Sequence, residues 1–207
     1  WTVTQTPSAA CGSDASLVAC YQMDEGSGNV LLDGSAFGKD AGIYGTPVWV
    51  TGKTGQAVDF SGTGQYAIAP DSAPLNVTGA VTITGWIRPE KVANQIILKK
   101  TIGTTASGFG LSLGSNNKVS FQINGGAATV QSLSNYSTDG TTWQHVAATF
   151  DGTNLKIYIN GVLDNTTTVA STTITANATA LGIGAQPDGT TLYQGAMDDV
   201  RIYNRTM

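Results

Sequence analysis

The stretch WQHVAATFDGTNLKIYINGVL (Trp143–Leu163) decides the fold. Apolar and polar residues roughly alternate over Trp143–Phe150 and alternate cleanly over Leu155–Asn160, which is the period of half-buried β-strands. Asp151-Gly152 supplies a turn between the two runs. Asn160-Gly161 favours a type I′ hairpin turn, because both central residues of that turn need positive φ. The stretch therefore predicts consecutive antiparallel strands joined by tight turns.

The composition favours an all-β domain. Charged residues make up 12% of the 207 residues, and Glu25 and Glu90 are the only glutamates. Long amphipathic helices usually need more charge on their exposed face, whereas abundant Thr and Val suit a pleated sheet. The 41% of hydrophobic residues suffices for a core, so the 26 glycines indicate turns and bulges. A net charge of −4 with no basic patch argues against nucleic-acid binding, and no apolar run is long enough to span a membrane.

Short strands with turn signals continue along the chain from Leu17 to Tyr203. We expect one antiparallel β-sandwich of two curved sheets, a jelly roll, over residues 17–207, with an N-terminal arm over residues 1–16. The first and last strands are expected to be neighbours. Besides the opening stretch, strands are predicted at 17–23, 56–60, 66–69, 80–88, 96–100, 109–113, 118–123, 128–133, 180–183 and 194–203, with 56–60 and 66–69 forming a hairpin.

The two cysteines, Cys11 and Cys20, lie close together in the sequence, and the intervening GSDAS can turn the chain. A disulfide between them fits an exported protein, so a secreted or cell-surface location is expected. The alternative is two reduced cysteines, one of them buried.

No constellation for catalysis stands out. Asp198 and Asp199 are adjacent on a predicted strand, where their side chains would point to opposite faces. The single histidine, His145, has no cysteine or serine beside it in a recognisable nucleophile setting and is interpreted as a structural or surface residue. The sequence predicts a protein that is not an enzyme.

Six segments in order resemble the laminin-G-like domain of the concanavalin A-like lectin/glucanase superfamily. They are YQMDEGSG, DGSAFGKDAGIYG, GKTGQAVDFSG, VTITGWIRP, WQHVAATFDGTNLKIYINGVL and GAMDDVRIYNR, and the resemblance extends over roughly residues 17–205. The paired carboxylates of the glucanase relatives, Glu-x-Asp-x-x-Glu, are missing here.

The resemblance implies a structural calcium ion where the loop after the first strand meets the last strand. The aspartate of the closing D-x-V-R-x-Y pattern corresponds to Asp198, and Asp24 and Asp33 are the expected partners by their positions in the early loops. Calcium takes six to eight oxygen ligands, and twelve aspartates, many beside glycines, offer that chemistry. The alternative is that Asp24 and Asp33 only cap turns. The loop DGSAFGKDAG departs from the family's usual Ser-Gly-Asn-Gly run.

A glycan site needs exposed aromatic rings. The resemblance places Trp86 and Trp143 in the core, which leaves Tyr136 and Tyr193, in the polar contexts SNYSTD and TTLYQG, as the expected exposed candidates. We therefore expect an extracellular, calcium-stabilised carbohydrate-binding or protein-binding module. The alternative is a structural or cell-adhesion subunit of a filament, stalk or coat, because WTVTQTPSAA (residues 1–10) alternates well enough to add to a neighbour's sheet edge.

Overall fold

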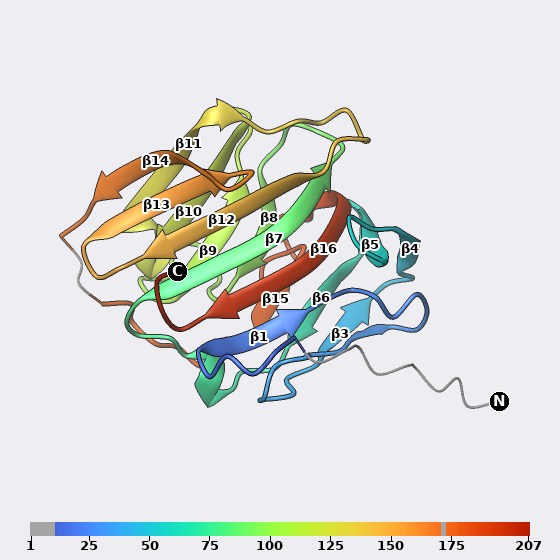
Figure 1. The fold of residues 1–207 in the computed structure, drawn as a ribbon, viewed down its shortest axis with the longest axis horizontal. Coiled ribbons are helices and arrows are strands. Elements are labelled where there is room, and N and C mark those ends of the chain that lie inside the picture. The colour runs from blue at the N-terminus through green and yellow to red at the C-terminus, as the bar shows by residue number, and fades with distance from the viewer. Residues whose placement is uncertain (1–10, 171–172) are drawn as a thin grey trace.

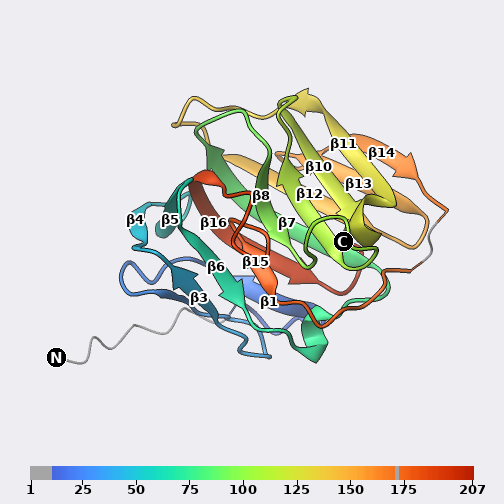
Figure 2. The same cartoon turned by 180° about the vertical axis from the view of Figure 1, so that it is seen from behind.

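The computed structural model describes residues 11–170 and 173–207, and it is a sandwich of two antiparallel sheets (Figures 1 and 2). Sheet A has the strand order β14-β13-β12-β7-β16-β5-β4, with β1 also pairing with β16. Sheet B has the order β11-β10-β9-β8-β15-β6-β3-β2. The predicted all-β jelly-roll sandwich is confirmed. Residues 1–10, on which the self-assembly hypothesis depends, lie outside the described residues.

The element bounds follow the chain from the first strand to the last. The strands are β1 Leu17–Tyr21, β2 Val30–Leu31, β3 Ala41–Tyr44, β4 Val48–Thr51, β5 Gln56–Ser61, β6 Tyr66–Ala69, β7 Val81–Pro89, β8 Gln95–Lys99, β9 Phe109–Leu113, β10 Lys118–Ile123, β11 Ala128–Asn135, β12 Gln144–Phe150, β13 Asn154–Ile159, β14 Val162–Thr168, β15 Leu181–Ile183 and β16 Gln194–Tyr203. Two short 3₁₀ turns, η1 Ala73–Leu75 and η2 Asn124–Gly126, complete the described structure.

The alternation of apolar residues explains the packing of the two sheets. In β7, Val81, Ile83 and Ile87 are fully buried between the sheets. The residues between them point to the outer face of sheet A, because successive side chains of a strand point to opposite faces. Asn160 (φ 51°) and Gly161 (φ 81°) form the expected positive-φ turn between β13 and β14. The pairing of β1 with β16 confirms that the first and last strands are neighbours.

The predicted hairpin of residues 56–60 and 66–69 is wrong, although both strands exist. Strand β5 pairs with β4 and β16 in sheet A, whereas β6 pairs with β3 and β15 in sheet B. The Ser61–Gln65 segment is therefore a corner between the sheets. Gly62 (φ 76°) and Gly64 (φ 67°) supply the positive φ angles of this corner.

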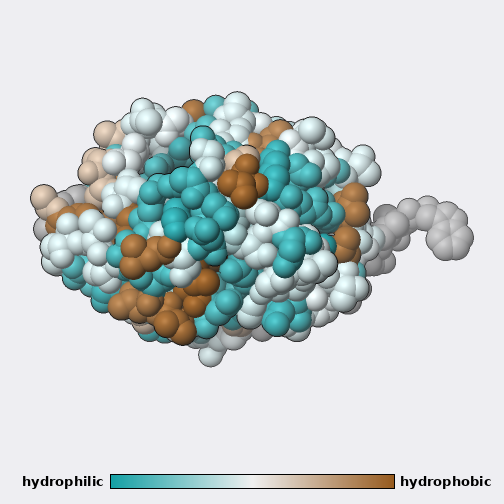
Figure 3. Space-filling view, turned by 90° about the horizontal axis from the view of Figure 1, so that it is seen from above, coloured by the Kyte–Doolittle hydropathy of each residue, from teal (hydrophilic) through white to brown (hydrophobic). Residues whose placement is uncertain are grey.

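The described surface carries its exposed apolar residues in scattered groups. Figure 3 shows them as separate patches on a face that is otherwise hydrophilic or neutral. Leu133 and Val162 are the most exposed of the large ones. No helix among the described residues is long and apolar enough to cross a membrane.

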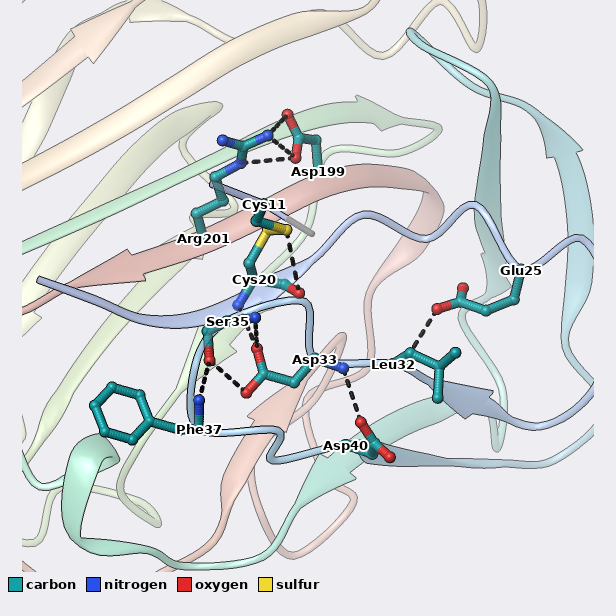
Figure 4. Close-up of a disulfide and its surroundings, with 10 residues drawn as sticks. All are labelled: Cys11, Cys20, Glu25, Leu32, Asp33, Ser35, Phe37, Asp40, Asp199 and Arg201. Atoms are coloured by element: carbon teal, nitrogen blue, oxygen red, sulfur yellow. Dashed lines mark hydrogen bonds and ion pairs between the residues drawn. A yellow bond between two sulfur atoms is a disulfide. The ribbon is translucent and has the colours of Figure 1, made fainter. Parts of the chain in front are cut away.

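The expected disulfide is present and ties Cys11 to Cys20 in β1 (Figure 4). Cys20 is fully buried, and the main-chain N–H of Cys11 donates to the carbonyl of Gly34 at 3.2 Å. The link therefore fastens the chain before β1 to the edge of sheet A and to the loop after β2.

Replacing both cysteines with serine should lower the free energy of unfolding by roughly 2–3 kcal/mol, because the unfolded chain loses a short covalent loop. For a domain of this size that corresponds to a fall in melting temperature of about 4–12 °C. Thermal melts of the double variant and of the reduced wild-type protein should agree. A variant that melts with the oxidised wild type would contradict the proposed stabilisation.

Candidate functional site

An open depression of about 610 Å³ lies on the outer face of sheet A. Its walls are Lys53, Trp86, Trp143, His145, Asn160 and Gly161. Trp86 projects from β7 on the face opposite the core residues Ile83 and Ile87. His145 is its register partner on β12. The Asn160-Gly161 turn closes one end, so the hairpin predicted from sequence forms part of this wall.

The aromatic rings of the depression contact one another and two cationic side chains. The ring centroids of Trp86 and His145 lie 5.1 Å apart at an interplanar angle of 66°. The Lys53 Nζ lies 4.7 Å from the centroid of the Trp86 ring. The guanidinium carbon of Arg88 lies 5.2 Å from the Trp143 ring centroid. Cation–π contacts of this kind hold rings and charged groups in defined positions.

A second depression of about 200 Å³ shares His145 and Gly161 with the first. It continues over β7, β12 and β13 to the C-terminal residue, and its other walls are Thr82, Thr84, Ala147, Thr149, Tyr158 and Met207. The two depressions together are called the sheet A groove below.

The His145 ring is the titratable group shared by both lobes of the groove. Partial burial lowers the pKa of His145 below its usual value, while the carboxylate of Asp199 opposes this shift. The imidazole is therefore neutral at pH 7, and it offers one hydrogen-bond donor and one acceptor to a ligand.

The expected exposure of the tryptophans and the tyrosines is reversed in the structure. Trp86 and Trp143 are partly exposed and line the groove, so their assignment to the core is wrong. Tyr136 and Tyr193 are 3% and 0% exposed, so the expectation that they are exposed is also wrong. The Tyr136 hydroxyl donates to the carbonyl of Gly114, and the Tyr193 hydroxyl donates to that of Ala196. Both rings belong to the hydrophobic core and cannot stack on a ligand in this structure.

Asp24 and Asp198, two of the three predicted calcium ligands, line one polar pocket of about 240 Å³ beside the groove. Asp199 and Arg201 line it as well, and Arg201 holds both carboxylate oxygens of Asp199 at 2.8 and 3.0 Å. The prediction that Asp198 and Asp199 point to opposite faces is wrong. The register of β16 shifts between Asp198 and Arg201, and Asp199 has φ 53°, so a bulge turns both carboxylates toward the same pocket.

The buried carboxylate of Asp198 holds the turn between β4 and β5. Its Oδ2 accepts the main-chain N–H groups of Lys53 at 2.7 Å and Thr54 at 3.0 Å. Asp24 Oδ1 accepts the N–H of Gln56 at 2.7 Å in the same turn. Burial raises the pKa of Asp198 to about 6, and nearby Asp199 and Asp24 add to the shift, while the two N–H donors oppose it.

Asp33, the third predicted ligand, is used differently. Its carboxylate accepts the N–H groups of Cys20, Ser35 and Lys39 and the hydroxyl of Ser35. Figure 4 shows it turned toward Ser35 and the main chain of Cys20. This arrangement is the turn-capping alternative for Asp33. Among the described residues, no three His, Cys, Asp or Glu side chains are grouped closely enough to hold a metal ion, so the three aspartates are not brought together.

Comparisons with known proteins agree with this architecture. A laminin G-like family model, described as the concanavalin A-like lectin/glucanases superfamily, matches residues 61–207. No curated protein sequence matches the chain significantly. The chain is similar in structure to the binding domain of Paraclostridial Mosquitocidal Protein 1 (TM-score 0.73, 15% identity) and to that of botulinum neurotoxin DC in complex with SialylT (TM-score 0.69, 17% identity). It covers 49% of each of these two chains, which cover 93% of it, so it spans about half their length.

A third similar structure has nearly the same extent as this chain. It is domain 4 of AbnA, an extracellular arabinanase of family GH43 from Geobacillus stearothermophilus, in complex with arabinotriose. The TM-score is 0.69 at 20% identity, with 90% of this chain and 91% of that one covered. At these identities the structural matches show the fold. The family model spans well over half of the chain, which therefore belongs to the laminin G-like family of the concanavalin A-like lectin/glucanases superfamily.

Proposed function

We propose that this chain is a non-catalytic module that binds a glycan in the sheet A groove. The observation that carries the proposal is the pair of partly exposed tryptophans, Trp86 and Trp143, lining one open depression. The flat apolar faces of such rings pack against the C–H faces of sugar rings. Lys53, His145 and Asn160 surround them with donors and acceptors for hydroxyl groups.

The comparisons support this class of function. The two toxin structures are binding domains, and the AbnA domain, which matches this chain over most of its length, is in complex with a saccharide, arabinotriose. The carboxylates nearest the groove have structural partners, since Asp198 accepts main-chain N–H groups and Asp199 pairs with Arg201. An extracellular location, favoured by the Cys11–Cys20 disulfide, is part of the proposal.

The single histidine makes a direct test possible. His145 lines both lobes of the groove, so its ring proton signals should shift when a glycan binds there. We expect a titration midpoint below 6.5 for the free protein, measured by NMR, and a saturable shift of the same signals with a bound saccharide. A glycan panel first identifies ligands. A panel hit that leaves the His145 and indole signals unchanged would place binding elsewhere and contradict the proposed site.

The structural calcium ion belongs to the proposal as well, with Asp24 and Asp198 as its carboxylate ligands. These two side chains line one pocket with Asp199, and because Arg201 already pairs with Asp199, the carboxylates of Asp24 and Asp198 are the ones that supply oxygen ligands to a hard cation. Carbonyl oxygens or water would have to complete the shell, because Asp33 caps its own loop.

Calcium should raise the melting temperature if it binds the folded protein and not the unfolded chain. At a calcium concentration 100 times the dissociation constant, the native state gains about 2.7 kcal/mol, or a rise of about 5–11 °C. Asp24→Asn and Asp198→Asn should each abolish the difference between melts in calcium and in EGTA. Asp139→Asn is the control, because Asp139 caps the turn at Thr141 and Thr142, and this variant should keep the calcium response. Equal melting temperatures of the wild type in calcium and EGTA would count against the ion.

A further inference from the structure

Lys53 differs from the other cations near the groove, because main-chain hydrogen bonds fix the turn that carries it. The turn that carries it, Gly52–Gln56, is fastened by Asp198 and Asp24 through three N–H donors. A Cβ atom added to Gly52 would lie 2.7 Å from Asp198 Oδ2, and one added to Gly55 would lie 2.1 Å from Asp24 Oδ1. The turn therefore packs closely against both carboxylates. Lys53 enters the groove wall from a rigid base.

The ammonium group of Lys53 has no carboxylate partner within the described part of the chain. The ion pairs there join Lys100 to Asp71, Lys156 to Asp151, Arg201 to Asp199 and Arg205 to Asp14. Asp198 contacts the main chain of Lys53 through its N–H. Arg88, the other cation beside the tryptophans, also forms no ion pair there, and its Nε is buried without a hydrogen-bond partner, but Arg88 does not line the larger depression. Lys53 is thus the cation in the wall of the larger depression, and it has no ion pair among the described residues.

We infer that the groove selects a carboxylate-bearing saccharide, with Lys53 as the residue that determines this specificity. The inference rests on the proposed function and names its ligand class. One sugar ring lies beside Trp86 and His145, and its carboxylate meets the Lys53 ammonium, which lies over the Trp86 ring. The walls of this lobe contain Lys53, His145 and Asn160 as polar side chains and no acid. A uronic acid and a sialic acid carry the same recognised group.

Binding of trigalacturonic acid should be compared with that of its methyl ester, which has the same rings and no charge. Sialyllactose and lactose form the second pair, which distinguishes a sialic acid from a uronic acid as the source of the carboxylate. By calorimetry at low ionic strength, at least one acid should bind about tenfold more tightly than its neutral partner. Lys53→Gln should remove that preference and Lys53→Arg should keep it. Lys39→Gln, the same charge change at an exposed site in the loop before β3, should leave it unchanged.

The His145 signal gives a second readout. A bound carboxylate near the ring should raise the pKa of His145, whereas the neutral sugar should leave it unchanged or lower it. The charged groups near that ring are Lys53 and Asp199, and neither differs between the two experiments.

The outcomes separate this inference from the proposed function. Equal affinity for acid and neutral sugars, with loss of both in Trp86→Ala, would overturn the inference and keep the glycan module. Acid binding that survives Trp86→Ala would also overturn it, because the charge would then act outside the groove. If neither acid binds, the inference fails, and the neutral members of the panel alone decide the proposed function.

Discussion

Trp86→Ala should weaken glycan binding by about 30-fold or more while the sandwich stays folded. Trp86 lines the larger lobe of the groove, where it contacts both the His145 ring and the Lys53 ammonium. Truncation of a central tryptophan in a binding site typically costs 2 kcal/mol or more, which corresponds to that change in affinity. Calorimetry with the best ligand of the glycan panel measures the loss. Circular dichroism and a thermal melt establish that the variant is folded.

Two variants separate the role of Trp86 from a general effect of aromatic residues. Trp86→Phe keeps a flat ring and should retain part of the affinity. Tyr44→Ala removes a 53% exposed ring that stacks on Tyr66 in sheet B, and it should bind like the wild type. If Trp86→Ala binds normally, the groove is not the glycan site.

Strand positions were predictable because the apolar period is strong. The predicted ranges of β6, β9, β10 and β16 match the structure residue for residue. The short strands β2 and β3 were missed, because they lie in a stretch rich in Asp, Gly and Ser that reads as loop. The partners of β5 and β6 were also missed. A glycine-rich link of four residues suits a hairpin and a corner between sheets equally well, and only the three-dimensional closure of the sandwich decides between them.

The groove could have been found from the sequence of β7. In VTITGWIRP the buried face is Val81, Ile83, Gly85 and Ile87, so the period of two places Trp86 on the opposite, outer face. The family resemblance favoured a buried tryptophan and led to the wrong assignment. Lys53 carries no comparable signal, because its place over Trp86 depends on the hydrogen bond that its main-chain N–H donates to Asp198, a residue 145 positions later in the chain.

The polar pocket beside the groove shows why a β-bulge makes the directions of side chains hard to predict. Adjacent residues of a regular strand point to opposite faces, which led to the prediction that Asp198 and Asp199 diverge. A non-glycine residue with positive φ inside a strand is uncommon, and the sequence DDVR contains no signal that predicts one. The extra residue at the bulge brings Asp199 beside Asp198 and pairs it with Arg201.

Lys100→Met should lower the free energy of unfolding by about 3 kcal/mol, the largest stability effect that we expect for a single charged residue of this chain. Lys100 follows β8 and is 1% exposed. Its ammonium donates to Asp71, to the carbonyl and amide oxygens of Asn177, and to the carbonyl of Thr179. Methionine fills a similar volume but leaves these oxygens without their donor.

The expected fall in melting temperature is about 6–12 °C. Lys156→Met is the matched control, because Lys156 forms a more exposed pair with Asp151 at 3.8 Å, and pairs of that kind contribute little. A similar loss in both variants would mean that charge alone is responsible. A loss confined to Lys100→Met would show that the ammonium stabilises the fold by holding residues 173–180 against β8 and β9, where Gly108 also donates to Thr175. Faster amide exchange in that segment should accompany the loss, since its hydrogen bonds depend on one buried cation.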